Sequence, residues 1–404
     1  MPVDAQSETA TEARQAPPGR IVLLLAVACG LTVANLYYAQ PLLAALRDAF
    51  HVGDVAAGSL VTVTQIGYAA GMVLLVPLGD RFETRRLVSV MLGVVTAALV
   101  VAGTAAYFPV LLAAALVIGA MSVVAQILVP FAANLAPDHR RGRVVGQVMS
   151  GLLAGILLSR TVGSLIAEVA GWRVVYLASA VFMAVLAVTL RSALPSRAPT
   201  TNEPYGRLLR STARLLRVHA PLRRRALFQA AMFGAFSAYW TTVSYVLTGA
   251  PFHYSELGVG VFALVGAGGA VIAPAAGRWA DRGLTLPMTA VAYGAGVLAF
   301  VVGGLGRDHV LLLAVAAVLV DMAVQSSFIL GQHTVYALAP EARARINSAY
   351  LATIFLGGAI GSQLGAFAYH SGGWGAVSVV GGALPLLALL AWSATDARRF
   401  TEYR

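Results

Sequence analysis

Lysine is absent from this chain, and acidic residues are scarce. The 404 residues include 28 basic side chains, all of them arginine, and only 17 aspartates and glutamates, so that 11% of the residues are charged. Soluble globular proteins carry about 25% charged residues. With 59% hydrophobic residues, the chain has too little polar surface to cover a water-soluble body, which excludes a cytosolic enzyme and a disordered protein. We therefore expect an integral membrane protein.

Cysteine and histidine are too few or too scattered for disulfide or metal chemistry. Cys29 is the single cysteine, which excludes an intrachain disulfide. The histidines have no metal-ligand spacing, and the sequence contains no phosphate-binding loop. We therefore expect no cofactor, no bound metal, no use of ATP and no enzymatic activity.

Long apolar runs are abundant. A helix needs about 20 mostly apolar residues to cross a bilayer, and continuous runs favour helices over the alternating strands of a barrel. The sequence predicts an all-α membrane protein with twelve transmembrane helices. The expected spans are 21–45, 55–79, 86–106, 109–136, 143–168, 172–193, 226–249, 258–279, 286–305, 310–338, 346–369 and 374–394.

Landmarks of the first half of the chain recur in the second half at nearly constant offset. Asp80-Arg81 recurs as Asp281-Arg282, and Gly171-Trp172 recurs as Gly373-Trp374. This duplication predicts two pseudo-symmetric six-helix bundles related as parallel repeats. The expected parts are a disordered cytoplasmic tail (1–20), an N-terminal bundle (21–193), a linker (194–225), a C-terminal bundle (226–394) and a second cytoplasmic tail (395–404).

The arginines lie almost entirely on one side of this arrangement. With the N-terminus inside, 24 arginines fall in cytoplasmic loops and tails, and only Arg47, Arg173 and Arg307 fall outside. By the positive-inside rule, this asymmetry places both termini in the cytoplasm, with the protein in the inner (plasma) membrane. The net charge of +11 is then a label of orientation, and we expect no nucleic acid as a partner.

The linker contains a stripe of basic residues at helical spacing. Leucines lie off this stripe, a pattern typical of a basic amphipathic helix on anionic lipid at the cytoplasmic face. A solvated linker with the same charges is the alternative. The stripe consists of Arg207, Arg210, Arg214 and Arg217.

Two loops resemble a family signature. The segment 78–86, which contains Asp80 and Arg81, resembles the major facilitator loop between helices 2 and 3, and the segment 277–282, which contains Asp281 and Arg282, resembles its second-half copy. The resemblance implies the major facilitator fold, with these four residues gating the inner side and helices 1, 4, 7 and 10 lining the cavity.

Three further segments are similar to a bacterial efflux-type branch of that family, whose members resemble drug or metabolite:proton antiporters. They are residues 35–42, 321–325 and 339–347. The antiporter pattern of helix 5 is kept only in part, since Gly151 and Gly155 are present while Ile156 stands where the pattern has proline.

Elimination leaves few charges inside the expected spans. Asp321 is the one acid deep in a span, and Arg160 is the one base. A charge in hydrocarbon is costly, so each is a candidate for function facing a cavity. We expect Asp321 to bind and release protons, because an apolar site favours the protonated carboxyl group. A permanently paired structural aspartate is the alternative.

Arg160 keeps its charge and must therefore face water, an acid or an anion. It could pair with Asp321 across the two halves or hold a substrate carboxylate. Snorkelling outward is the equally weighted alternative.

Polar and aromatic side chains on the expected pore helices complete the predicted site. Amides and hydroxyls that are unsatisfied in lipid cost free energy, so they should face the pore or a neighbouring helix. As a set they describe an aromatic, mostly neutral pocket for an amphipathic organic molecule. The candidate substrate-binding residues are Asn35, Tyr38, Gln65, Tyr68, Gln126, Phe233, Phe236, Trp240, Gln325 and Gln332.

Together these patterns predict a monomeric transporter that exports a small amphipathic compound or drug by proton-coupled alternating access. Its expected partners are the small-molecule substrate, protons and anionic lipid. Two alternatives remain: proton-coupled uptake or exchange of an anionic metabolite, and a transport-inactive membrane sensor.

Overall fold

The computed structural model describes residues 19–196, 201, 203–338 and 342–397, and within these ranges it contains helices and no strands. The first half contains α1 (Gly19–Ala34), α2 (Leu43–Phe50), α3 (Asp54–Leu74), α4 (Leu78–Arg81), α5 (Thr84–Gly103), α6 (Phe108–Met121), α7 (Val124–Leu135), η1 (Asp138–Arg140), α8 (Arg141–Ala170) and α9 (Trp172–Ala193). The second half contains α10 (Tyr205–Val218), α11 (Ala220–Thr248), α12 (Glu256–Ala263), η2 (Leu264–Ala267), α13 (Gly268–Asp281), α14 (Thr285–Leu305), α15 (Val310–Tyr336), α16 (Arg343–Trp392) and η4 (Ser393–Ala397).

Most of the two predicted tails, part of the linker and residues 339–341 of one family-like segment lie outside the described residues.

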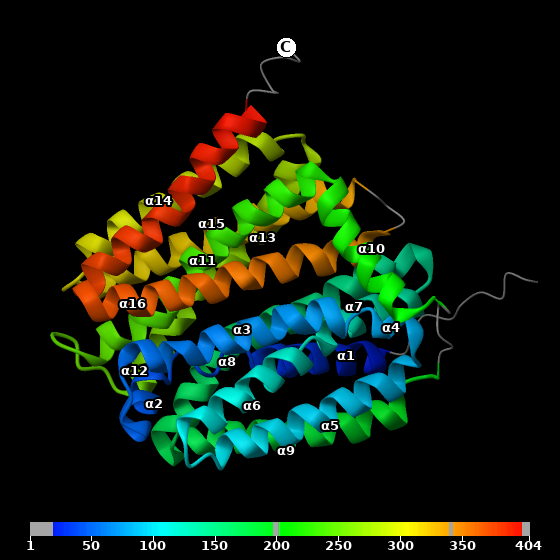
Figure 1. The fold of residues 1–404 in the computed structure, drawn as a ribbon, viewed down its shortest axis with the longest axis horizontal. Helices are drawn as coiled ribbons and strands as arrows, with labels where there is room; N and C mark the ends of the chain where they lie inside the picture. Colours follow the sequence, from blue (N-terminus) through cyan, green and yellow to red (C-terminus); the bar gives the residue numbers. More distant parts are fainter. Residues whose placement is uncertain (1–18, 197–200, 202, 339–341, 398–404) are drawn as a thin grey trace, which may run out of the picture.

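The helices form two bundles that lie side by side (Figure 1). One bundle contains α1 and α3 to α9, the other contains α11 and α13 to α16, and α3 packs along α16 where the bundles meet. The helices α2 and α12 lie at one end of the molecule, here called the α2 end, and α4 and α10 lie at the opposite α10 end. The predicted all-α fold with two six-helix bundles is confirmed.

The helices are long enough to account for the twelve predicted spans. In the described part of the chain, nine helical segments are long and apolar enough to cross a membrane. The pair α1 and α2 and the helix α11 add two more spans. α16 contains two, because its backbone is non-helical at Gly372 and Gly373.

Three spans that the sequence predicts as continuous are interrupted. The first is broken between α1 and α2, where short turns such as the bond from Gln40 N to Tyr37 O replace the α-helical ladder and Pro41 lacks a backbone donor. The fourth is broken between α6 and α7, and the eighth contains the 3-10 segment η2. These interruptions place the Tyr37, Gln40 and Gly266 backbones around the centre of the molecule.

The predicted duplication is visible in the backbone. Gly171 and Gly373 both have positive φ, 83° and 61°, a conformation that glycine adopts without steric cost. Each precedes a buried tryptophan, Trp172 or Trp374, at the start of the last helix of its bundle. The same turn therefore ends the fifth span of each half.

Glycines bring two helix pairs into backbone contact at equivalent places in the two bundles. A Cβ atom on Gly155 of α8 would clash with the carbonyl oxygen of Gly30 on α1, and one on Gly361 of α16 would clash with that of Gly234 on α11. Such small-residue contacts allow close helix packing in membranes, where lipid tails give no hydrophobic drive for helices to associate.

The linker helix α10 lies differently from the expected lipid-facing arrangement. Leu208 and Thr212 are buried against protein, and the Tyr205 hydroxyl donates to the Leu74 carbonyl at 2.6 Å. Arg345 of α16 donates to Ser211 at 3.1 Å. Part of the apolar face of α10 therefore packs against the two bundles. The four arginines of the stripe are exposed, and their contact with anionic lipid stays a prediction.

Replacing Gly361 by alanine is expected to destabilise the protein. The new methyl group has no room against α11, and overpacking costs about 1–3 kcal/mol. The matched control is Gly93→Ala on α5, where an added Cβ meets no atom within 4 Å. Thermal unfolding in detergent should show a lower midpoint for Gly361→Ala and an unchanged or higher one for Gly93→Ala; equal midpoints would contradict the packing account.

Candidate functional site

A cavity of about 130 Å³ lies between the two bundles near the centre of the molecule. Both bundles contribute to its walls, which are mostly aliphatic and aromatic. Two of the lining side chains are charged, one from each bundle. The lining residues are Tyr37, Leu153, Ile156, Leu157, Arg160, Phe233, Phe236, Gly266, Ala267, Gly269, Asp321, Val324 and Gln325.

Asp321 enters this cavity from α15 and is 9% exposed. The indole nitrogen of Trp240 on α11 donates to Asp321 Oδ1 at 2.9 Å. Glycines in and after η2 make room for the carboxylate, since a Cβ on Gly266 would lie 2.6 Å from Oδ2 and one on Gly269 would lie 3.0 Å from the Asp321 Cβ. The interrupted eighth span thus permits a carboxylate at this depth.

Arg160 enters from α8 and is 3% exposed. Its Nε donates to Gln40 Oε1 at 3.0 Å, while its Nη2 is buried without a hydrogen-bond partner. The guanidinium carbon lies 4.1 Å from the centre of the Trp240 ring and 5.3 Å from the rings of Tyr37 and Phe236. Aromatic faces stabilise a desolvated cation through the ring quadrupole, so Arg160 faces the protein interior rather than snorkelling outward.

Trp240 connects the two charges. It lies under the Arg160 guanidinium and donates to the Asp321 carboxylate. Among the described residues, no ion pair within 4.0 Å joins Arg160 to Asp321. The two charges therefore share one aromatic partner without neutralising each other directly.

The structure brings only part of the predicted substrate-binding set to this cavity. Phe233, Phe236 and Gln325 line it, and Trp240 holds Asp321. Gln40, one of the polar residues expected on the first pore helix, and Tyr37, which was not expected there, both contact Arg160. The break before Pro41 would have been the signal for them, because it turns both side chains away from a regular helical face.

Other candidates lie where the bundles meet along α3. Gln65 donates to Ser237 on α11 at 3.1 Å. Tyr68 accepts a hydrogen bond from Gln126 at 3.2 Å and packs against Phe355 at 4.3 Å between ring centres. The Gln65–Ser237 and Tyr68–Phe355 contacts cross from one bundle to the other, whereas the Gln126–Tyr68 bond lies within the first bundle. None of these side chains lines the cavity beside Asp321, and Gln126 lines the pocket around Asp80.

Three candidates are engaged elsewhere. Asn35 accepts a hydrogen bond from Ser179 at 2.6 Å, within the first bundle. Tyr38 lines an apolar groove between α1 and α8. Gln332 donates to Tyr336 at 2.9 Å, near the α10 end.

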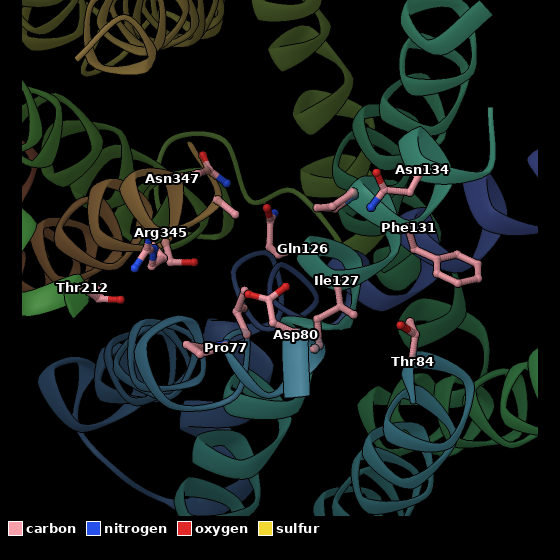
Figure 2. Close-up of a pocket in the computed structure, with 15 residues that line it drawn as sticks. Pro77, Asp80, Thr84, Gln126, Ile127, Phe131, Asn134, Thr212, Arg345 and Asn347 are labelled. Carbon is pink, nitrogen blue, oxygen red and sulfur yellow. The ribbon is translucent and has the colours of Figure 1, made fainter. Parts of the chain in front are cut away.

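The predicted gating residues lie at the α10 end, where a second pocket of about 110 Å³ opens between the bundles. Figure 2 shows Asp80 in the middle of this pocket and Arg345 and Thr212 across from it. Asp80 belongs to α4 of one bundle, Arg345 to α16 of the other, and Thr212 to α10. The sequence reasoning did not anticipate Arg345 or α10 at this place.

The remaining gating candidates lie on the surface at that end. Arg81 donates to the Glu203 carbonyl at 3.4 Å in an exposed position. Asp281 and Arg282 are exposed where α13 ends. In the described residues the two halves of the predicted gate are therefore not equivalent.

Polar contacts hold the bundles together at the α2 end. Thr62 of α3 donates to Gln363 of α16 at 3.1 Å, and Thr161 of α8 donates to the Gly260 carbonyl of α12 at 2.8 Å. The Glu168 carboxylate accepts from the Leu257 backbone N–H at 3.1 Å. Polar contacts thus join the bundles at the α2 end, and the pocket around Asp80 lies between them at the α10 end.

Comparison with known proteins identifies the family. The model of the Major Facilitator Superfamily matches residues 23–306, more than half of the chain. This chain belongs to the major facilitator superfamily. The facilitator is 40% identical to the uncharacterized transporter YgaY of Escherichia coli O157:H7 over 372 residues, which cover 92% of this chain and 94% of YgaY.

Two further likenesses agree with this assignment. The facilitator is 36% identical to the probable transporter SCO4007 of Streptomyces coelicolor over 376 residues, covering 93% of this chain and 86% of that protein. The crystal structure of the nucleoside transporter NupG matches with a TM-score of 0.75 and 14% identity, over 93% of this chain and 99% of that chain. The facilitator is thus a multi-pass membrane protein of transporter type.

Replacing Trp240 by phenylalanine should lower the free energy of unfolding, because it removes the hydrogen-bond donor to Asp321 and keeps an aromatic ring under Arg160. A hydrogen bond to a charged group contributes about 1.5–3 kcal/mol. The free energy of unfolding, measured in mixed micelles, should fall by this amount in Trp240→Phe. The control is Trp279→Phe, whose residue is half-buried on α13, and its free energy of unfolding should fall by less. In an Asp321→Asn background the Trp240→Phe effect should shrink; an effect of the same size there would mean that the two side chains are not coupled.

Proposed function

We propose that this facilitator exports a small amphipathic organic compound in exchange for protons by alternating access. The observation that carries the proposal is the pair of buried, opposite charges that line one central cavity from different bundles. Charged groups at such depth are rare, and they mark ion and substrate pathways in transporters.

Asp321 is the proposed proton site. It is the acid that lines the central cavity, and its accepted hydrogen bond from Trp240 favours the ionised form while the apolar walls favour the protonated form. Two opposing influences of this kind let the carboxyl group change its protonation state during a cycle. Trp240 donates to this carboxylate and lies under Arg160 of the other bundle, so protonation of Asp321 would change the attraction between the bundles.

The arginine distribution assigns a direction to the two ends. The α10 end contains the arginine-rich segments. By the positive-inside rule, we propose that this end faces the cytoplasm and that the protein lies in the inner membrane. The α2 end then faces outward, and the pocket around Asp80 and Arg345 opens inward. The proposed cycle begins with substrate entering from this inward opening.

One observation favours a second candidate, proton-coupled movement of an anionic metabolite. Arg160 Nη2 is buried beside the cavity without a hydrogen-bond partner, and a carboxylate or other anion of the substrate would satisfy it. The cavity volume also favours a small metabolite over a larger drug, since drug-sized pockets measure about 300–1,000 Å³.

Replacing Asp321 by asparagine is expected to abolish proton-coupled flux while leaving the fold intact. Proteoliposomes carrying a pH-sensitive dye would be challenged with compounds that raise the unfolding temperature of the protein. The expected result is a loss of at least about tenfold in compound-driven proton movement. Asp308→Asn, at an exposed position, is the matched control and should transport normally. Full flux in Asp321→Asn would overturn the assignment.

Locking the α2 end should stop transport. Thr62→Cys with Gln363→Cys, in a Cys29→Ala background, puts two thiols where the side chains now meet at 3.1 Å. Cross-linking with a short bis-methanethiosulfonate, which joins the two thiols through disulfides, should lower the flux to background, and reduction of these disulfides should restore it. Each single-cysteine variant is the control. Undiminished flux in the cross-linked protein would exclude opening at this end.

A further inference from the structure

The central cavity presents one cation and one anion to any molecule inside it. Arg160 belongs to α8 of the first bundle and Asp321 to α15 of the second, and both line the same space. Arg160 is 3% exposed and Asp321 is 9% exposed, so bulk water solvates neither charge.

Neutral partners hold these charges apart. Gln40 accepts from Arg160 Nε at 3.0 Å, and Trp240 donates to Asp321 Oδ1 at 2.9 Å. Each partner satisfies one edge of its charged group, and Arg160 Nη2 is buried without any hydrogen-bond partner from the protein. A guanidinium edge next to a cavity recognises a carboxylate, and a carboxylate in the same cavity recognises an ammonium group.

We infer that the substrate is a small zwitterion whose carboxylate binds Arg160 and whose ammonium group binds Asp321. This inference rests on the proposed transport function and specifies the substrate class of the same site. The aromatic and aliphatic walls, with Phe233, Phe236 and Leu157 among them, would pack against the carbon skeleton.

Charge balance separates this class from molecules with a single charge. A monocation would compensate Asp321 and leave Arg160 without a counter-charge. A monoanion would compensate Arg160 and leave an ionised Asp321 without one. A buried charge that loses its partner is strongly unfavourable. A zwitterion compensates both charges at once, and it connects the two bundles because each charge lies on a different one.

The same arrangement explains how export is coupled to protons. When the ammonium group occupies Asp321, the carboxyl group must be ionised, so its proton is released to water. When the substrate has left, a proton takes its place on the carboxylate. Proton and substrate therefore compete for one group, which produces exchange rather than co-transport.

The test measures binding to the full-length protein in nanodiscs with matched sets of compounds. One set is L-phenylalanine, phenethylamine and phenylpropanoate; a second is γ-aminobutyrate, butylamine and butyrate; a third is 5-aminolevulinate with its amine-only and acid-only analogues. At least one zwitterion should bind about tenfold or more tightly than both of its single-charge analogues, the ratio expected for one charge-assisted hydrogen bond.

Two variants then assign the contacts. Arg160→Gln should remove the advantage of the zwitterion over the amine and keep its advantage over the acid, and Asp321→Asn should do the reverse. Arg307→Gln, at an exposed position, is the control and should bind as the original protein does. The comparison of compounds on the unaltered protein needs no variant to fold.

The inference is overturned if, in every set that binds, the amine-only or the acid-only compound binds as tightly as its zwitterion, or if none of the zwitterions binds. Such a result leaves the proposed function standing when Asp321→Asn still loses proton-coupled flux with another substrate. Conversely, zwitterion binding without any proton-coupled flux would refute the transport cycle and not the substrate class.

Discussion

The structure depends on the high free-energy cost of a charge in an apolar membrane protein. Asp321 and Arg160 are held near the centre by partners that meet this cost without pairing the two charges: Gln40 for the arginine, and Trp240 for both. Each partner depends in turn on backbone geometry, because the break before Pro41 directs Gln40 inward and the glycines around η2 admit the carboxylate. The irregular backbone therefore lies where it surrounds a cavity, as expected for membrane-embedded chains.

Helix contacts within each bundle differ from the contacts between the two bundles. Glycine contacts bring the backbone of α1 against α8 and that of α11 against α16. Contacts between the bundles combine side-chain packing, such as Tyr68 on Phe355, with hydrogen bonds such as Thr62 to Gln363 and Thr161 to Gly260. Such polar contacts can be exchanged one by one, which suits two bundles that rock against each other. At the opposite end α10 touches both bundles, through Tyr205 and Ser211.

In helix α15, sequence periodicity predicts which residues share a face but not which residues they contact. Its spacing predicts one polar and aromatic face that contains Asp321, Gln325, Phe328, Gln332 and Tyr336. In the structure Gln325 lines the cavity, Phe328 stacks on Tyr350, and Gln332 and Tyr336 bond with Asn347. Periodicity gives the direction of a side chain around the helix axis, whereas its partner depends on which helix lies opposite at that depth.

The sequence by itself determined the membrane class, the twelve spans, the duplication and the two charges inside the spans, because hydrophobicity, helical length and charge scarcity are local properties of the chain. Only the tertiary structure decided that Trp240 lies between those charges, that Gln40 supports one of them, and that α10 packs on protein. These are contacts between residues that are distant in the chain, such as Gln40 and Arg160. They follow from how whole helices pack, which no short stretch of sequence specifies.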